Sequence, residues 1–196
     1  MKFIDDPVLD AIAHRRSVSK VGPNTPSDQE IRTLLAAVTH VADHKSLRPW
    51  RLILLRGEDR LTLARALDAA QGIERPEGEV NPKPFRAELL IALVASPVEH
   101  EKVPTWEQHA TAAGVGHLLE LALWQAGWGV MWRTGIFANA PQVRRAHGLG
   151  ENELLMGWLY VGDIDASHRQ RLDESHRPPL NPDQFIGHMP QGRESG

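Results

Sequence analysis

The spacing of apolar residues along the chain predicts an alternation of helices and strands. Apolar positions recur at helical intervals over residues 7–16, 27–42, 58–71, 106–126 and 139–147. Shorter apolar runs bounded by turn residues predict strands over 51–55, 89–95, 130–132 and 154–161. The helical segments dominate and no internal repeat is visible, so an α+β domain is expected.

Two of these segments are expected in the interior. Residues 89–95 read LLIALVA, which is typical of a strand buried on both faces. The helix over 106–126 is apolar almost all round, which indicates burial in a core or in a subunit interface. Gly114 and Gly116 would weaken this helix in isolation, so close packing is the predicted reason for them.

The remaining long segments are polar and contain several prolines. Residues 72–86 (GIERPEGEVNPKPFR) have no hydrophobic period and are expected to form an exposed loop or lid. Residues 163–196 predict a polar arm that is either disordered or lies on a partner surface. The chain as a whole, residues 1–196, is expected to be a single domain that carries this arm.

Composition narrows the classes of function. Of the 196 residues, 41% are hydrophobic and 24% are charged, as in ordinary globular proteins. The formal charge of −3 gives no overall attraction to nucleic acid or to an anionic membrane, so any basic site must be local. The chain has no cysteine, which excludes disulfides and thiolate chemistry. Without a signal peptide or an apolar run of membrane-spanning length, a cytoplasmic protein is expected.

Two polar clusters suit the binding of an anion. At the end of the first helix, Arg15, Arg16 and Ser17 combine guanidinium groups with a hydroxyl, which suits a phosphate. Basic residues at a helix C-terminus also complement the helix dipole, which is the plainer interpretation. The stretch 43–50 (DHKSLRPW) is either a polar loop that leads into a strand or a site for a small anionic, aromatic ligand.

Other catalytic and binding patterns have little support. His40 and His44 have a metal-compatible spacing, but no HExxH motif or Cys/His cluster accompanies them, and a surface or capping role is the alternative. Neither a full dinucleotide-binding glycine motif nor a P-loop occurs, and no serine lies in a GxSxG elbow. Trp132, Arg133 and Thr134 place an aromatic ring, a guanidinium group and a hydroxyl in sequence after a small-residue turn.

Six stretches occur in an order that is specific when they are taken together. They are RRSVS at 15–19, VADHKSLRPWRLILL at 41–55, PFRAELLIALVA at 84–95, HEKVPTWEQ at 100–108, GWGVMWRTG at 127–135 and LMGWLYVGD at 155–163. In this order, from about residue 12 to residue 163, the chain resembles the FMN-dependent nitroreductase family, and in particular its compact bacterial NAD(P)H nitroreductases.

The resemblance implies a nitroreductase-like sandwich, with a central, mostly antiparallel sheet flanked by helices, in an intertwined homodimer. It implies FMN at the dimer interface, touching both chains, and NADH or NADPH as the reductant. Hydride would pass through flavin N5 to a nitroaromatic, a quinone or a similar small-molecule acceptor in a ping-pong mechanism. Because the cofactor carries the redox chemistry, no side chain is expected to act as the catalytic acid or base.

The resemblance also implies particular contacts with the cofactors. Arg15, Arg16 and Ser17 match the motif for the flavin phosphate and ribityl chain, and Trp132, Arg133 and Thr134 match a second flavin segment. His44 matches a flavin contact from the partner subunit, and His40 lies where compact relatives have an arginine contact. A nicotinamide-nucleotide contact is implied for Ala122, Leu123, Trp124, Gln125, Ala126 and Gly127.

The sequence departs from the family pattern in the charge expected near the flavin. Many larger relatives have a lysine two residues after the motif serine, where this chain has Ser19, followed by Lys20. The C-terminal residues also lack the basic cluster that those relatives place on the phosphate, which leaves Arg133 to supply that charge. A non-enzymatic or regulatory flavin-binding protein, a flavin-consuming or dehalogenating enzyme and a His-ligated metalloprotein are the alternative functions.

Overall fold

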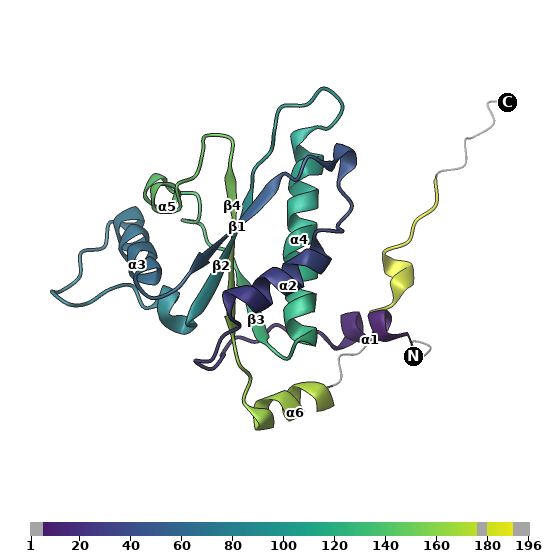
Figure 1. Ribbon diagram of the computed structural model, residues 1–196, viewed down its shortest axis with the longest axis horizontal. Coiled ribbons are helices and arrows are strands. Elements are labelled where there is room, and N and C mark those ends of the chain that lie inside the picture. The colour runs from purple at the N-terminus through teal and green to yellow at the C-terminus, as the bar shows by residue number, and fades with distance from the viewer. Residues whose placement is uncertain (1–5, 176–179, 190–196) are drawn as a thin grey trace.

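A computed structural model describes residues 6–175 and 180–189, and it confirms the α+β class. The described residues form an antiparallel sheet from β1 (Trp50–Leu55), β2 (Leu89–Ala95), β3 (Gly129–Arg133) and β4 (Leu154–Gly162). The strand order is β1-β2-β4-β3, which leaves β3 at one edge. Figure 1 shows the sheet between a layer of α3 and α5 on one side and a layer of α2 and α4 on the other.

The helices agree in most places with those predicted. They are α1 (Pro7–His14), α2 (Asp28–Val38), α3 (Glu58–Gln71), α4 (Thr105–Gln125), α5 (Pro141–Ala146) and α6 (Ala166–Glu174), with 3-10 turns at His44–Ser46, Lys83–Arg86 and Pro182–Gln184. The capping box of α2 is present, because Ser27 and Glu30 bond each other's backbone N–H groups. The prediction that this helix continues to residue 42 was wrong, since α2 ends at Val38.

The prediction for strand 89–95 was confirmed. Every residue of β2 is buried, because helices cover the sheet on both faces. Alternate residues of the strand contribute to two cores. Leu90, Ala92 and Val94 pack toward α3 and α5. Leu89, Ile91 and Leu93 pack toward α2 and α4.

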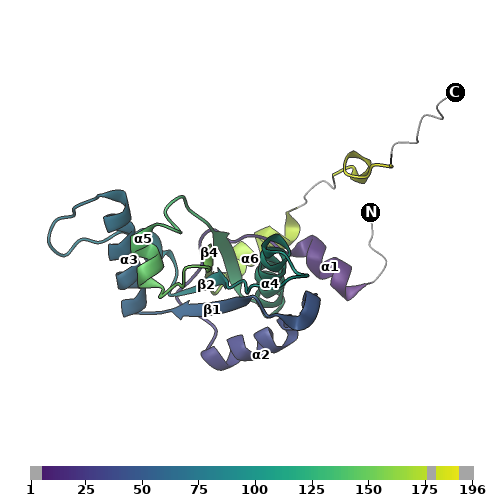
Figure 2. The same ribbon diagram turned by 90° about the horizontal axis from the view of Figure 1, so that it is seen from above.

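Helix α4 is buried on one side only, so the core of this chain accounts for one face of the helix predicted to lie in a core or in a subunit interface. Its inner face includes Leu119 and Leu123, which are fully buried. On the outside, however, 70% of Trp106 and 39% of Leu118 are exposed. Figure 2 shows that α4 and α2 cover the same side of the sheet, with α1 beyond α4. The outer apolar face of α4 is therefore only partly covered by the described part of the chain, which leaves Trp106 and Leu118 exposed.

Helix α6 falls within the predicted polar arm and was not expected. The Asp165 carboxylate caps it by accepting hydrogen bonds from the N–H groups of Ser167 and His168, at 3.0 and 3.2 Å. Polar side chains occupy every side of this helix, so it has no hydrophobic period. Residues 176–179 and 190–196 of the predicted arm lie outside the described residues. None of the helices in the described ranges is long and apolar enough to cross a membrane.

Candidate functional site

A cavity of about 460 Å³ lies beside the edge strand β3, on the face of the sheet that carries α3. We call it the β3 cavity. Its walls come from the end of β3 and the loop after it, from α3, from the turn at Lys83–Arg86 and from β4. The polar and aromatic residues of its lining are Gln71, Lys83, Arg86, Trp132, Arg133, Thr134, Phe137, Trp158 and Tyr160.

The lining of the β3 cavity is strongly basic, although the protein is acidic overall. Lys83, Arg86 and Arg133 contribute positive charge, and no Asp or Glu belongs to the lining. None of the three forms a salt bridge with a described carboxylate. Uncompensated cations around a concave surface attract an anionic ligand.

Arg133 is held in place by several contacts, but one of its hydrogen-bond donors has no acceptor within the described residues. Its Nη2 donates a hydrogen bond to the Ser19 carbonyl at 3.0 Å, and its guanidinium lies 5.4 Å from the centre of the Tyr160 ring. Its Nε is buried and has no hydrogen-bond partner within residues 6–175 and 180–189. A buried donor without an acceptor is costly, so this nitrogen indicates a position for a ligand acceptor.

The turn that carries Lys83 and Arg86 is anchored to α3. Asp68 of α3 accepts two hydrogen bonds from the Arg75 guanidinium, at 2.6 and 3.0 Å, and one from the Asn81 amide at 2.9 Å. Arg75 thereby holds the pKa of the Asp68 carboxyl below its usual value. The buried Asn81 in turn accepts a hydrogen bond from the Lys83 N–H at 3.1 Å.

These hydrogen bonds hold the inner part of the loop predicted over 72–86 against α3. Its outer part borders an open hollow of about 740 Å³ against α3. That hollow has mixed charge, with Arg65 and Arg75 beside Asp68, Glu74 and Glu79, and it contains none of the residues expected to bind a cofactor. We place the candidate site in the smaller β3 cavity, where the basic side chains and the expected segment meet.

A glycine lets the two strands at the cavity approach closely. Gly157 of β4 has a φ of +118°, and a Cβ atom there would lie 2.5 Å from the Arg133 carbonyl oxygen. The indole Nε1 of Trp132 donates a hydrogen bond to the Met156 carbonyl at 3.0 Å. Gly157 thus allows the backbone geometry that fixes Trp132 and Arg133 at the edge of the sheet.

The fold brings two of the expected cofactor segments together. The Val18 N–H donates a hydrogen bond to the Val130 carbonyl at 2.8 Å, and Arg133 binds Ser19, so residues 15–19 run beside β3. Arg15 lies near the surface, with its Nη1 3.4 Å from the Ser17 hydroxyl oxygen.

Arg16 is directed into the protein. It is buried, and its guanidinium donates hydrogen bonds to the carbonyls of Ala13 and Ser175, at 2.8 and 3.0 Å. These contacts join the end of α1 to the end of α6. Of the two motif arginines, Arg15 is the one that presents its guanidinium toward solvent in the single chain.

The loop over 43–48 holds three non-glycine residues in the left-handed region. The φ angles are +64° for Lys45, +53° for Ser46 and +49° for Arg48. The Asp43 carboxylate stabilises this conformation by accepting hydrogen bonds from the N–H groups of Leu47 and Arg48, at 3.2 and 2.7 Å. Backbone strain of this kind concentrates at functional sites, so the structure favours a role for this loop beyond a simple connection.

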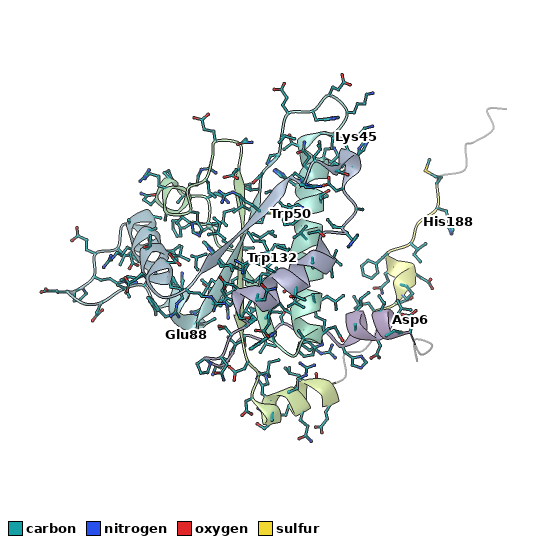
Figure 3. The ribbon with its side chains drawn as sticks, viewed as in Figure 1. Asp6, Lys45, Trp50, Glu88, Trp132 and His188 are labelled. Carbon is teal, nitrogen blue, oxygen red and sulfur yellow. The ribbon has the colours of Figure 1, made fainter. Side chains whose placement is uncertain are left out.

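Within one chain, His44 lies far from the β3 cavity. Its Nδ1 is 2.9 Å from the Glu107 carboxylate, in the first turn of α4. Trp132, at the edge of the cavity, packs against Gly116 in the middle of α4, which at about 1.5 Å per residue is roughly 13 Å along the helix from Glu107. The cavity itself lies on the opposite face of the sheet. Figure 3 shows Lys45 in the upper part of the view, beside the start of α4 and well above Trp132.

His40 and the last turn of α4 are also peripheral to the cavity. His40 is exposed just after α2, and no group of three or more potential metal-ligating side chains occurs among the described residues. In the stretch 122–127, Leu123 and Trp124 are buried, with the Arg169 guanidinium of α6 lying 3.9 Å from the Trp124 ring centre. Gln125, Ala126 and Gly127 are exposed.

Sequence reasoning missed several residues of the cavity, notably Gln71, Lys83, Arg86 and Tyr160. Arg86 and Tyr160 lie inside stretches that carry the family resemblance, which was the available signal. Their meeting depends on how α3 and the Lys83–Arg86 turn pack on the sheet, and no local pattern encodes that.

Comparison with known proteins places this chain and its fold in one family. A profile of the Nitroreductase family matches residues 12–163. The Escherichia coli K12 protein "Putative NAD(P)H nitroreductase YdjA" is 33% identical over 158 residues, which cover 79% of this chain and 86% of that protein. The chain belongs to the nitroreductase family.

Solved structures agree with this fold. A nitroreductase-like family protein from Bacillus cereus superposes with a TM-score of 0.76 at 19% identity, covering 95% of this chain and 97% of the other. The FMN-dependent nitroreductase NfnB from Mycobacterium smegmatis, solved in complex with NADPH, has a TM-score of 0.67 at 17% identity, with coverages of 93% and 97%.

Proposed function

We propose that this protein is an FMN-dependent oxidoreductase that uses NADH or NADPH to reduce a nitroaromatic, a quinone or a similar small acceptor. The observation that carries this proposal is the basic, aromatic β3 cavity, which lies beside the expected Trp132–Thr134 segment on a nitroreductase fold. The relatives support the choice of cofactors, since NfnB is an FMN-dependent enzyme that was solved with NADPH.

The residues of the cavity suit FMN. Ligand cavities have volumes of about 300–1,000 Å³ and combine apolar walls with a few polar groups, as here. Phe137 and Tyr160 offer aromatic surface on this face of the sheet, and the Arg133 Nε offers a buried donor without an acceptor in the described chain. Arg15 and Ser17 run beside β3 without lining the cavity, and we expect them at the phosphate end of FMN.

When bound, FMN would supply the redox chemistry, accepting a hydride from NAD(P)H and passing it on to the acceptor. The chain's own contribution is binding, orientation and electrostatics. Lys83, Arg86 and Arg133 line the cavity and would hold positive charge beside a bound FMN, which would favour its more negative, reduced form. Many larger relatives have a lysine at the position of Ser19, and these three side chains would provide positive charge in its place. A ping-pong mechanism follows if the nicotinamide and the acceptor bind in turn on the same open side of the flavin.

We further propose that the site is completed by a second copy of the chain. His44 is too far from its own β3 cavity to reach it, so its expected flavin contact requires a partner. Large exposed apolar side chains provide a surface for such a partner, on α1, on the outer face of α4 and in residues 180–189, namely Val8, Leu9, Ile12, Trp106, Leu118, Leu180, Phe185, Ile186 and Met189. Light scattering should show a dimer in dilute solution, and a flavin-loaded monomer would contradict this arrangement.

Steady-state turnover tests the enzymatic assignment. The FMN-loaded protein is mixed with NADPH or NADH and with a nitroarene or quinone, and nucleotide oxidation is followed by absorbance. Acceptor-dependent oxidation is expected. Tight flavin binding without turnover, for every combination tested, would instead indicate a non-enzymatic flavin-binding protein.

A further inference from the structure

Tyr160 is a buried polar side chain whose hydroxyl has no role inside the described protein. It is the only tyrosine in the sequence, it lies in the central strand β4, and 5% of its surface is exposed. Its ring packs in the core between the sheet and α3, and the residue also lines the β3 cavity. Its hydroxyl forms no hydrogen bond with any residue in the described ranges.

The Tyr160 hydroxyl is open to the β3 cavity, because the residue lines the cavity and its hydroxyl is not among the fully buried polar atoms of the described residues. Phenylalanine would fill the same core space, so the hydroxyl is available for a hydrogen bond to a molecule in the cavity. The rest of the Tyr160 side chain is well packed, so the hydroxyl group is the part that packing does not explain. A group on a bound ligand is the natural partner, because the cavity is the open space beside this residue.

The surroundings of Tyr160 indicate the chemistry of that ligand. The Arg133 guanidinium lies 5.4 Å from the ring centre, and Arg86 is close enough for its charge to act on the phenol. Burial raises the pKa of Tyr160 against the opposing effect of the two arginines, so the phenol keeps its proton at neutral pH. The cavity thus presents an O–H donor near two cations, which suits an electron-rich oxygen or nitrogen.

We propose that the Tyr160 hydroxyl donates a hydrogen bond to an electron-rich oxygen or nitrogen of the ligand in the β3 cavity, in concert with Arg86 and Arg133. This inference rests on the proposed function, in which that ligand is either FMN or the acceptor bound next to it. The residue then binds and orients the ligand directly, and it adds a donor at a position where negative charge is held.

Because the protein has a single tyrosine, one NMR signal reports on the proposal. The full-length protein is labelled with ¹³C at tyrosine Cζ, whose chemical shift responds to hydrogen bonding of the hydroxyl. Spectra are recorded for the flavin-free protein, after addition of FMN, and after addition of 4-nitrobenzoate to the oxidised FMN-loaded protein. A shift on the second spectrum identifies FMN as the acceptor of the hydrogen bond, and a shift confined to the third identifies the nitroaromatic.

The variant Tyr160→Phe removes the hydroxyl and keeps the ring. If FMN is the partner, FMN should bind roughly three- to tenfold more weakly, as expected for one neutral hydrogen bond. If the nitroaromatic is the partner, its KM should rise by a similar factor while FMN affinity is unchanged. Thr62→Val is a matched control, since it removes an exposed hydroxyl on α3 that bonds only within its own helix, and it should change neither quantity.

The outcomes separate this inference from the proposed function. The role of Tyr160 alone is overturned if the protein binds FMN and turns over, but the tyrosine signal moves with neither ligand. In that case the Tyr160→Phe variant also behaves like the parent. A protein that binds no FMN overturns the proposed function and this inference with it. A melting temperature for Tyr160→Phe shows whether any loss of affinity comes from unfolding instead.

Discussion

Gly116 of α4 couples the packing of the helix to the candidate site. A Cβ atom at this position would lie 2.7 Å from Leu93 Cδ2 and 2.7 Å from two ring carbons of Trp132. Leu93 is fully buried and the Trp132 indole is tied to Met156, so neither can easily move away. Overpacking of this kind typically costs about 1–3 kcal/mol, while the better helix propensity of alanine returns about 1 kcal/mol.

Gly114 provides an internal control for Gly116→Ala in the same helix. A Cβ atom there would meet only Val41 Cγ2, at 3.1 Å, and a small movement of that half-buried side chain relieves the contact. Gly114→Ala gains the same helix propensity without striking Trp132. We therefore expect Gly116→Ala to be about 1–3 kcal/mol less stable than Gly114→Ala, and to bind FMN more weakly because Trp132 is displaced.

Urea unfolding measures the stability difference, and fluorescence titration of the flavin-free proteins measures FMN affinity. Both alanine variants gain the same helix propensity, so the difference in their stability measures the steric clash at Gly116. Equal stability of Gly116→Ala and Gly114→Ala, together with equal FMN affinity, would refute the reasoning that Trp132 is held against α4 at the site.

Two further predictions concern ion pairs and the flavin phosphate. Chiefly through Arg51, the pKa of Glu153 is held at about 2, so its stabilising contribution is full above about pH 4.5 and is lost as the pH falls toward 2. Glu153→Gln should lower the free energy of unfolding by about 1–2 kcal/mol at pH 7, after allowance for the partly exposed Arg51, and by less at pH 4. A stability difference from urea unfolding that grows on acidification would contradict this. Arg15→Ala and Ser17→Ala should each weaken FMN binding roughly ten- to a hundredfold with the fold intact, and unchanged affinity in titrations would remove both from the site.

Local patterns were sufficient for most of the secondary structure. The apolar run of β2 and the capping box of α2 carry their structure in a few neighbouring residues, and both were predicted correctly. Helix α6 was missed because it has no hydrophobic period; the structure shows it capped by Asp165 and in contact with the core through Arg169 on Trp124. The apolar helix α4 was predicted to lie in a core or in a subunit interface; its inner face lies in the core, whereas Trp106 and Leu118 on its outer face are exposed.

The site could be predicted only where a short motif contains it. Trp132–Thr134 was found because its residues are consecutive and resemble a family motif. Lys83 and Tyr160 were not predicted as site residues. Lys83 is brought to the cavity by a loop that Asp68 holds against α3, and Tyr160 belongs to a strand whose sequence is typical of a buried core. That these side chains share one cavity is a property of tertiary packing, which a single sequence does not display.

The visible absorption spectrum of the purified protein tests the central claim most directly. The protein is equilibrated with FMN, desalted, and measured before and after anaerobic addition of NADPH or NADH. The account predicts a protein-bound flavin spectrum that bleaches with at least one of the two nucleotides. A protein that is colourless after desalting would contradict the assignment of the β3 cavity as a flavin site, and a flavin that neither nucleotide bleaches would contradict the assignment as an NAD(P)H-dependent oxidoreductase.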